Sequence, residues 1–279
     1  MVSINVTNLA VGFVLSLLIA AVAVRARSLS ESGAIGAVVE GTVIFGLGGW
    51  MWGILLIAFF VSSSALSHYR AARKASLAEK FAKTGRRDLS QVLANGGWGA
   101  LLAALSVVVP DRWPLFVAFA GGMAAVNADT WATELGVLSP HQPRLIINGH
   151  VVSVGTSGAI SSWGMAAAIG GSLFIAGIAM VLSALHAASA VTDLLWLGVA
   201  TVCGGLAGSL VDSLLGATVQ GIYWCERDQK ETEKRVHSCG QPTRLLRGWA
   251  WMDNEWVNFL CSLAGSLVAW LLWLSAVLR

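Results

Sequence analysis

Three acidic residues lie in long apolar segments of the sequence, where a charged side chain is costly. They are Asp129, Glu134 and Asp212. An acid at the centre of a membrane helix costs about 2.5–3.5 kcal/mol on insertion scales, so it usually faces a cavity or a partner. Carboxylates at one membrane level could hold Mg²⁺, which prefers a few carboxylates with phosphate oxygens and water. We therefore predict that these three acids are catalytic metal ligands. The alternative is that they only hydrogen-bond one helix to another.

Two of the acids belong to a pattern that occurs twice. Gly121–Ala124 precedes Asp129-Thr130 by four residues, and Gly204–Ala207 precedes Asp212-Ser213 by the same interval. If both segments are helices that cross in the same direction, each presents an acid and a hydroxyl at the same depth. Chance in Gly- and Ala-rich helices is the alternative. Helical spacings of three and four place further polar residues beside these acids, namely Asn127, Thr130 and Gln220.

Basic and small polar residues near these acids could bind phosphate. Arg86 and Arg87 directly precede an apolar segment, and Arg144 follows another. The segment Gly155–Gly158 precedes a third, and a Gly/Ser/Thr loop at a helix N-terminus offers N–H groups to an anion. It is not a Walker A motif. The alternative for the basic residues is that they only set the orientation of the chain in the membrane. The alternative for the small residues is that they only cap a helix. The predicted nucleotide- and phosphate-binding residues are Arg86, Arg87, Asp88, Gln91, Asn95, Asn127, Thr130, Arg144, Gly155, Thr156, Ser157, Gly158, Ser213, Gln220, Asn254 and Asn258.

A second group of potential metal ligands lies near the C-terminal end. Cys225, Asp228, His237 and Cys239 fall within fifteen residues of one another and could ligate zinc in a small hairpin. Zinc sites usually have two pairs of Cys or His, and here Asp228 replaces one of them. The sequence leaves open whether this segment binds zinc.

The composition indicates that lipid surrounds most of this chain. Of the 279 residues 56% are hydrophobic and 12% are charged, roughly half the charged fraction of a soluble domain. The mean hydropathy is +0.71. We predict an all-α polytopic membrane protein, a single transmembrane domain over residues 1–279. Eight segments approach the 20 or so apolar residues that a span needs, although the second is short and could be re-entrant. They are Asn8–Val24, Gly33–Leu47, Trp50–Leu66, Val92–Val109, Pro114–Leu138, Gly158–Leu182, Leu194–Ala217 and Glu255–Val277.

The basic residues predict how these segments are oriented. With eight crossings, all of the 18 Lys and Arg residues except Arg112 and Arg279 fall in connections on one side. The positive-inside rule makes that side cytoplasmic, with both termini outside and cytoplasmic loops at about 68–90, 139–157 and 220–250. A re-entrant second segment would break this alternation. No basic residue precedes the first apolar segment, which is therefore predicted to be a retained helix. We expect a multi-pass protein of the cell inner membrane.

Six sequence blocks together resemble one widespread family of integral membrane proteins, whose plant chloroplast member is the phytyl-phosphate kinase of tocopherol synthesis. The resemblance covers nearly the whole chain. One departure is visible, because Asp228 stands where members of the family tend to have a second Cys after Cys225. The blocks are Gly85–Gly97, Asn127–Gly136, Pro143–Ile146, Gly155–Gly158, Asp212–Gln220 and Val257–Phe259.

The resemblance implies an enzyme, a phosphotransferase that moves a phosphoryl group from a nucleoside triphosphate, CTP or ATP, to a prenyl monophosphate. The expected cofactor is Mg²⁺, and the expected partners are the prenyl monophosphate, the nucleotide and membrane lipids, with no nucleic acid. A homodimer is compatible with the sequence. The alternatives are a polyprenyl-phosphate transporter or flippase, a CTP-dependent lipid cytidylyltransferase and a structural membrane protein.

Overall fold

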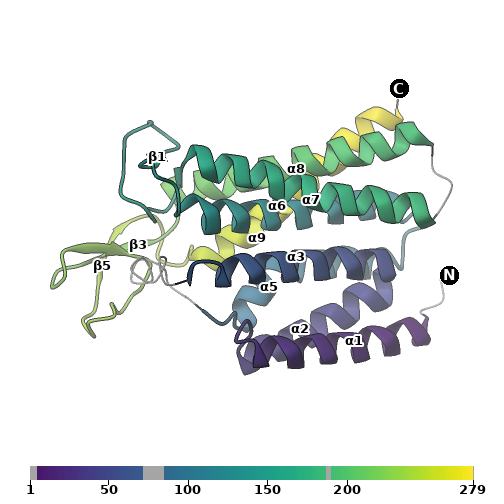
Figure 1. The fold of residues 1–279 in the computed structure, drawn as a ribbon, viewed down its shortest axis with the longest axis horizontal. Coiled ribbons are helices and arrows are strands. Elements are labelled where there is room, and N and C mark those ends of the chain that lie inside the picture. Colours follow the sequence, from purple (N-terminus) through teal and green to yellow (C-terminus); the bar gives the residue numbers. More distant parts are fainter. Residues whose placement is uncertain (1–4, 72–84, 187–189, 279) are drawn as a thin grey trace.

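The computed structural model describes residues 5–71, 85–186 and 190–278. Within these ranges eight α-helices run roughly along the long axis of the molecule, and short strands lie at one end of it (Figure 1). Both termini lie at the opposite end. The basic residues Arg73, Lys74, Lys80, Lys83 and Arg279 lie outside the described ranges. The helices are α1 (Val6–Arg25), α2 (Glu31–Val43), α3 (Trp50–His68), α5 (Leu89–Leu105), α6 (Trp113–Gly136), α7 (Ser162–His186), α8 (Val191–Thr218) and α9 (Asn254–Val277).

Each of the eight predicted apolar segments forms a helix, and five of these described helices are long and apolar enough to cross a membrane. These five are α1, α3, α7, α8 and α9. Among the others, α5 has 17 residues, and α2 has 13 and continues as a π-helix over Ile44–Gly48. Helix α6 has 24 residues, but its second half carries Asn127, Asp129 and Glu134. A mostly helical, multi-pass fold is therefore confirmed, whereas the count of eight spans and their orientation stay predictions.

Glycines set the depth of the two acids in the core of the bundle. Helix α6 contacts α7, α8 and α9, and α8 also contacts α7 and α9. A Cβ atom added to Gly121 in α6 or to Gly204 in α8 would lie 2.7 Å or 2.5 Å from the same carbonyl oxygen, that of Gly265 in α9. Both helices therefore approach α9 closely at one level. Asp129 and Asp212 each follow their glycine by eight residues. The repeated pattern thus places both acids at one level.

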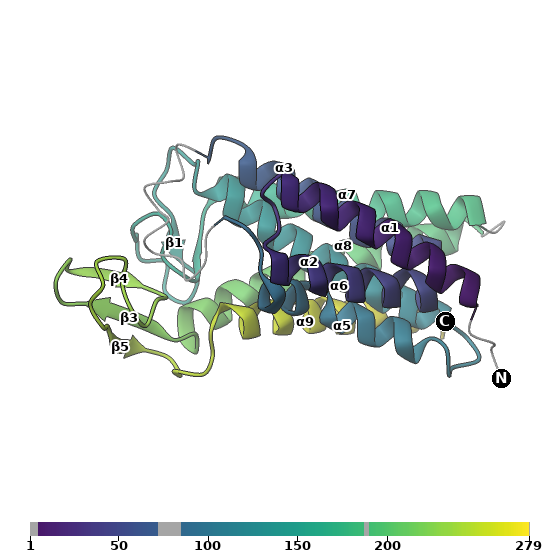
Figure 2. The same cartoon turned by 90° about the horizontal axis from the view of Figure 1, so that it is seen from below.

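The remaining helices form a second group beside this core. Helix α1 contacts α2, α2 contacts α5, and α5 contacts α6 and α9 (Figure 2). The connection from α1 to α2 also pairs with the segment before α5: the Arg87 N–H donates to the Ser28 carbonyl (2.9 Å) and the Ser30 N–H donates to the Arg87 carbonyl (3.0 Å). A Cβ on Gly33 would lie 2.1 Å from that Arg87 carbonyl oxygen. The first turn of α2 therefore fixes the backbone of Arg87.

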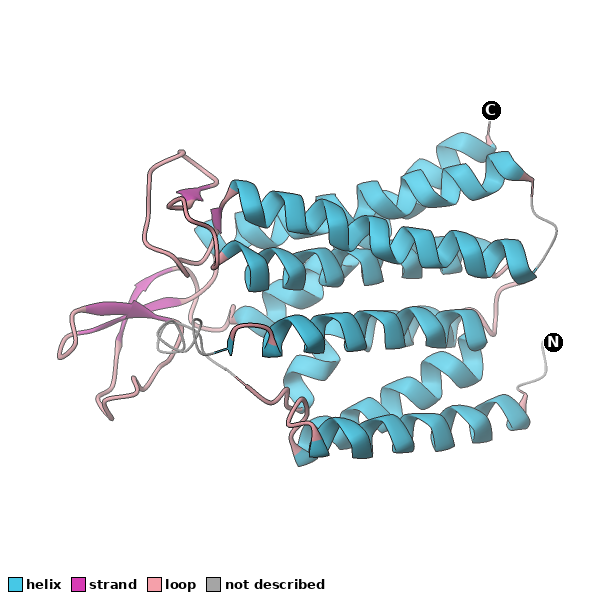
Figure 3. Ribbon diagram, viewed as in Figure 1, coloured by secondary structure: helices cyan, strands magenta, loops and turns pink. Residues whose placement is uncertain are grey.

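Two small antiparallel sheets correct the expectation of an all-α protein (Figure 3). In the first, β1 (Arg144–Leu145) pairs with β2 (Ala159–Ile160). In the second, β3 (Ile222–Cys225) lies between β4 (Lys230–Thr232) and β5 (Arg244–Arg247). Strands of two to four residues are too short to show the alternation by which a strand is recognised in a sequence. Both sheets fall in connections that were predicted as loops.

The first sheet also corrects the predicted start of one helix. Residues Gly158–Leu182 were predicted as a span, but α7 begins at Ser162, and its first turn is capped by the Ser161 hydroxyl, which accepts from the Gly164 N–H (3.0 Å). Strand β2 therefore separates Gly155–Gly158 from the helix. The prediction that this loop lies at a helix N-terminus was wrong.

Candidate active site

A cavity of about 540 Å³ opens at the sheet-bearing end of the bundle. Its volume is within the range of small-molecule sites in proteins, about 300–1,000 Å³. Helices α3, α5, α6, α7, α8 and α9 contribute to its wall, together with the segment before α5 and the loop between β1 and β2. Asp129, Glu134 and Asp212 all line it. The three predicted acids therefore face one space.

Asp129 and Asp212 lie side by side in the wall of this cavity. Their carboxyl groups are close enough to repel each other electrostatically, although they come from different helices. The Asp212 Oδ2 atom is buried and has no hydrogen-bond partner in the described part of the chain. Two carboxylates at this distance repel each other unless a proton or a cation lies between them. Their arrangement suits a shared divalent cation.

The third acid, Glu134, interacts with groups from other elements. One turn beyond Asp129 in α6, its Oε1 accepts a hydrogen bond from the Ser67 hydroxyl of α3 (2.6 Å). It also attracts the guanidinium of Arg87 electrostatically. Arg87 partly neutralises the charge of Glu134, whereas the Asp129–Asp212 pair has no such cation beside it in the described contacts. The position of Glu134 is therefore explained by a role in orienting Arg87.

Arg87 is held against α3 and lines the cavity. Its Nη1 donates to the Ser64 hydroxyl (3.1 Å), and its guanidinium lies 5.8 Å and 5.7 Å from the ring centroids of Phe59 and Phe60. Burial lowers the pKa of Arg87, and the attraction of Glu134 opposes that shift. A guanidinium remains protonated in such a site. The cavity thus contains a positioned cation beside its acids.

The loop Gly155–Gly158 forms another part of the wall. Gly155 and Gly158 have φ values of 79° and 80°, in the left-handed region that glycine adopts most readily. The Thr156 N–H donates to the Ser153 carbonyl, whereas the N–H groups of Gly155, Ser157 and Gly158 donate to no other described group. Successive N–H groups in such a turn can bind an anion. The loop therefore remains a candidate phosphate site, although no helix begins there.

Residues of the second sheet reach the cavity in a way that the sequence did not indicate. Gln220 accepts from the Ser157 hydroxyl and donates to Glu233 Oε1 (3.0 Å), and Glu233 lines the cavity close enough to Asp212 to repel it electrostatically. Arg247 donates to the carbonyls of Gly216 (2.7 Å) and Ser157 (3.2 Å). Burial lowers the pKa of Arg247, against the attraction of nearby glutamates. The sheet thus brings a further acid to the site and joins the 155–158 loop to α8.

The remaining predicted binding residues divide into two sets. One set lines the cavity, and its members are Gln91, Asn95, Thr130, Ser213, Asn254 and Asn258. The members of the other set do not line it, and they are Arg86, Asp88, Asn127, Arg144 and Gln220. A direct binding role of this second set stays a prediction.

The contacts of the second set explain its positions. Arg86 is exposed, and Asp88 caps α5 by accepting from the Gln91 N–H. Asn127 is buried between helices, where it accepts from the Ser62 hydroxyl (2.9 Å) and donates to the Gly171 carbonyl (2.9 Å). Arg144 is exposed and donates to the Gly149 carbonyl. These side chains have packing or surface roles in the structure.

Several cavity residues were missed in the sequence. They include Arg27, Ser67, His68, Glu233 and Glu255. Arg27 lies just after α1, and His68 is the last residue of α3. No short-range pattern in the sequence distinguishes these five residues, because they come from separate elements that only the fold brings together.

A second, mostly apolar cavity of about 80 Å³ lies between α1, α2, α3 and α5, and the buried Glu40 also lines it. Its wall includes Leu15, Ile19, Ala37 and Phe60. Three residues line both cavities: Arg87, Gln91 and Asn95. The mostly apolar cavity between the helices therefore adjoins the polar, acid-lined cavity at Arg87.

Known proteins resemble this chain over most of its length. Residues 14–266 match the family described as integral membrane protein DUF92. Protein PGR of Arabidopsis thaliana is 32% identical over 272 residues, which cover 91% of this chain and 92% of that protein. An uncharacterized membrane protein of Methanocaldococcus jannaschii is 34% identical over 69% of this chain and 75% of its own length.

A chloroplast protein is among the relatives. Protein VTE6, chloroplastic, of Arabidopsis thaliana is 25% identical over 86% of this chain and 64% of its own length. No solved structure matches the chain. The extent of the family match makes this protein a member of the DUF92 family of integral membrane proteins.

Proposed function

We propose that this protein is a membrane-embedded prenyl monophosphate kinase that uses a nucleoside triphosphate and Mg²⁺ to make the prenyl diphosphate. The observation that carries the proposal is the junction of two cavities, one polar and acid-lined, the other apolar, at Arg87. A prenyl phosphate has the same two parts, since its tail belongs in lipid and its headgroup needs a cation. The resemblance to a family with a phytyl-phosphate kinase supports the same activity.

The donor set at the acid pair fits Mg²⁺. Asp129 and Asp212 offer carboxylate oxygens from two helices, one of these oxygens is buried without a described partner, and Glu233 is near. Mg²⁺ is usually bound by one or two carboxylates with phosphate oxygens and water completing its shell. When bound, the ion would neutralise charge on the transferred phosphoryl group. Asp129 and Asp212 are therefore the proposed Mg²⁺ ligands. Glu233, which the sequence did not indicate, is a nearby acid in the same cavity.

The proposed reaction needs no general base from the protein. An oxygen of the prenyl monophosphate attacks the γ-phosphorus of the nucleotide, and the bond from that phosphorus to the β–γ bridging oxygen breaks. The products are the prenyl diphosphate and the nucleoside diphosphate. Because the acceptor is already anionic, the protein contributes mainly positioning and charge neutralisation. In this proposal Arg87 holds the acceptor phosphate, and the N–H groups of Gly155, Ser157 and Gly158 hold a phosphate of the nucleotide.

Product analysis tests this function directly. Purified protein in detergent is incubated with short prenyl monophosphates, Mg²⁺ and either CTP or ATP, and the lipid products are identified by mass spectrometry. We expect a lipid that has gained one phosphoryl group, together with nucleoside diphosphate. Release of pyrophosphate with a nucleotidyl-lipid would instead identify a cytidylyltransferase. Lipid movement across vesicles without nucleotide consumption would identify a transporter.

A substitution in the apolar cavity should change which tail the enzyme accepts. Ala37→Phe fills part of that cavity, so we expect kcat/KM for long-chain prenyl phosphates to fall by about 10-fold, and that for the shortest substrates to fall less. One buried methylene is worth about 0.8 kcal/mol, so the loss of contact with two carbons is sufficient. Competition between two chain lengths in one reaction measures the ratio.

The matched control for this prediction is Val39→Phe, which adds the same ring to α2 at an exposed position. It should leave the chain-length ratio unchanged. If both variants reduce activity equally for every chain length, the apolar cavity does not hold the tail.

A further inference from the structure

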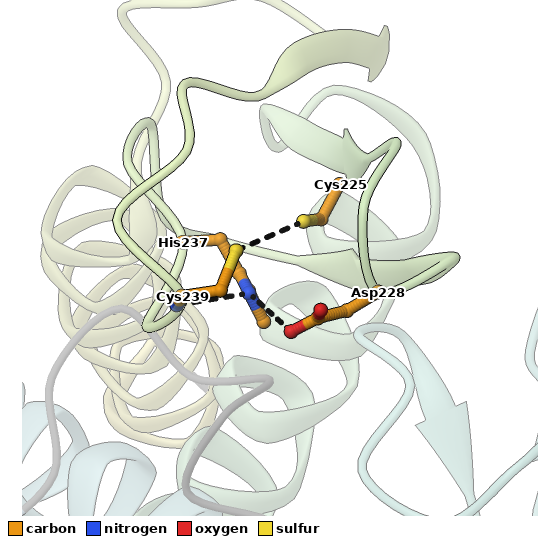
Figure 4. Close-up of side chains that lie close together, drawn as sticks. All are labelled: Cys225, Asp228, His237 and Cys239. Atoms are coloured by element: carbon orange, nitrogen blue, oxygen red, sulfur yellow. Dashed lines mark hydrogen bonds and ion pairs between the residues drawn. The ribbon is translucent and has the colours of Figure 1, made fainter.

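Four side chains from the second sheet and its connecting loops converge outside the cavity. Cys225 ends β3, Asp228 lies in the turn to β4, and His237 and Cys239 lie in the loop before β5 (Figure 4). One ligand atom from each of the four lies within 4.8 Å of the others. The Cys225 and Cys239 Sγ atoms are 3.6 Å apart, and His237 Nδ1 lies 3.2 Å from Asp228 Oδ2. From this convergence we infer that these residues form a closed, structural zinc site.

The distances between the ligand atoms suit a tetrahedral ion. With Zn–S bonds of about 2.3 Å, two sulfurs of a tetrahedron are about 3.8 Å apart. With Zn–N and Zn–O bonds of about 2.1 Å, the nitrogen and oxygen are about 3.4 Å apart. The observed separations, 3.6 Å and 3.2 Å, are close to both values. Two sulfurs with one nitrogen favour zinc over Mg²⁺ or Ca²⁺, which prefer oxygen ligands.

The environment of His237 supports a cation. His237 is buried, and its Nε2 atom has no hydrogen-bond partner in the described part of the chain. Its Nδ1 lies near Asp228 Oδ2 and also near the Cys239 backbone N–H (3.4 Å). Nδ1 cannot donate to the carboxylate and accept from the N–H in the same neutral ring. A metal ion bound by Nδ1 and by the Asp228 carboxylate would hold these two atoms together in place of a proton, so the ring would not need to donate and accept at one nitrogen.

The loops around these residues gain stability from a metal because their sheet is small. Strands of three and four residues bury little apolar surface. Folded units that are this small commonly depend on a metal ion or on disulfides for their stability. This sheet also delivers Glu233 and Arg247 to the cavity and its loop. Zinc would therefore hold the part of the chain that completes the site, without touching the substrate.

Metal analysis of the intact protein tests this inference. Protein purified in detergent without chelators should contain about one zinc per chain by mass spectrometry of the elements. With Co²⁺ as the probe, thiolate coordination should give a charge-transfer band in the near ultraviolet and tetrahedral bands in the visible. Protein that binds neither ion, even after incubation with a slight excess, would overturn the site. So would a Cys225–Cys239 disulfide, detected as two free thiols in the unfolded, metal-free chain in place of four.

The chain offers a matched control for this test. Cys225→Ser with Cys239→Ser should lower the affinity for zinc by more than about 10-fold, the lower end of what loss of even an outer-shell partner costs a metal site, and should lower the zinc content with it. Cys203→Ser removes a cysteine of α8 and should keep the full zinc content. Equal zinc content in both proteins would contradict the inference. Metal binding is measured without substrate, so its result is independent of whether the protein is a kinase.

Discussion

Asp212→Asn should abolish phosphoryl transfer while leaving the protein folded. In the proposed site Asp212 and Asp129 hold Mg²⁺ together, and Asn keeps the shape of the side chain but removes its charge. Removal of outer-shell partners already costs metal sites about 10- to 100-fold, so loss of a direct ligand should lower kcat/KM by at least about 100-fold. The same change relieves repulsion between two acids, so thermal stability without Mg²⁺ should stay equal or rise. Initial rates and thermal unfolding in detergent measure the two effects.

The control for this substitution lies in the same helix. Asp193 is exposed in the first turn of α8, at the end opposite to Asp212, and Asp193→Asn should retain wild-type activity. Asp129→Asn should behave like Asp212→Asn, because the ion needs both oxygens. Full activity in either cavity variant would remove the metal assignment. A loss of folding would instead mean that the pair has a structural role.

Much of the helical fold could be predicted because a membrane-spanning helix can be recognised from its own residues alone. A segment that spans lipid must be apolar and must satisfy its own backbone hydrogen bonds, so five of the described helices stand out in the sequence as long apolar runs. The sheets could not be predicted in this way. The pairing of β3 with β5 joins residues separated by about twenty positions, and neither strand is long enough to show a pattern. The boundary before α7 was missed for the same reason, since β2 has only two residues.

The site could be predicted where its residues repeat a helical pattern. Asp129 and Asp212 were found because each follows a glycine pair by the same interval, and the contact of these glycines with Gly265 gives that interval its physical meaning. Residue type alone was insufficient elsewhere. Asn127 has the chemistry of a ligand but is used within the bundle, and Glu233 reaches the cavity through contacts of a sheet that the sequence did not reveal.

The second large effect is expected on kcat/KM when Arg87 is replaced, and its neighbour Arg86 provides the control. Arg87→Gln should lower kcat/KM for the prenyl monophosphate by about 10- to 150-fold, because a hydrogen bond to a charged group is worth about 1.5–3 kcal/mol and 1.4 kcal/mol is a factor of ten. Arg86→Gln should stay within about 5-fold of wild type, since an exposed charge outside the cavity contributes at most about 1 kcal/mol. Both substitutions remove one positive charge from the same segment. A difference between them therefore reports position and not net charge.

Stability must be separated from binding in the Arg87 variant, because Glu134 loses its cationic neighbour. Breaking a buried pair costs about 3–5 kcal/mol, and this partly buried one should cost less. Arg87→Gln with Glu134→Gln removes both charges and should restore thermal stability towards that of wild type without restoring activity. If the double variant regains activity together with stability, Arg87 only supports the fold. If activity stays low while stability returns, the guanidinium acts on the substrate, and the junction of the two cavities is where the phosphate binds.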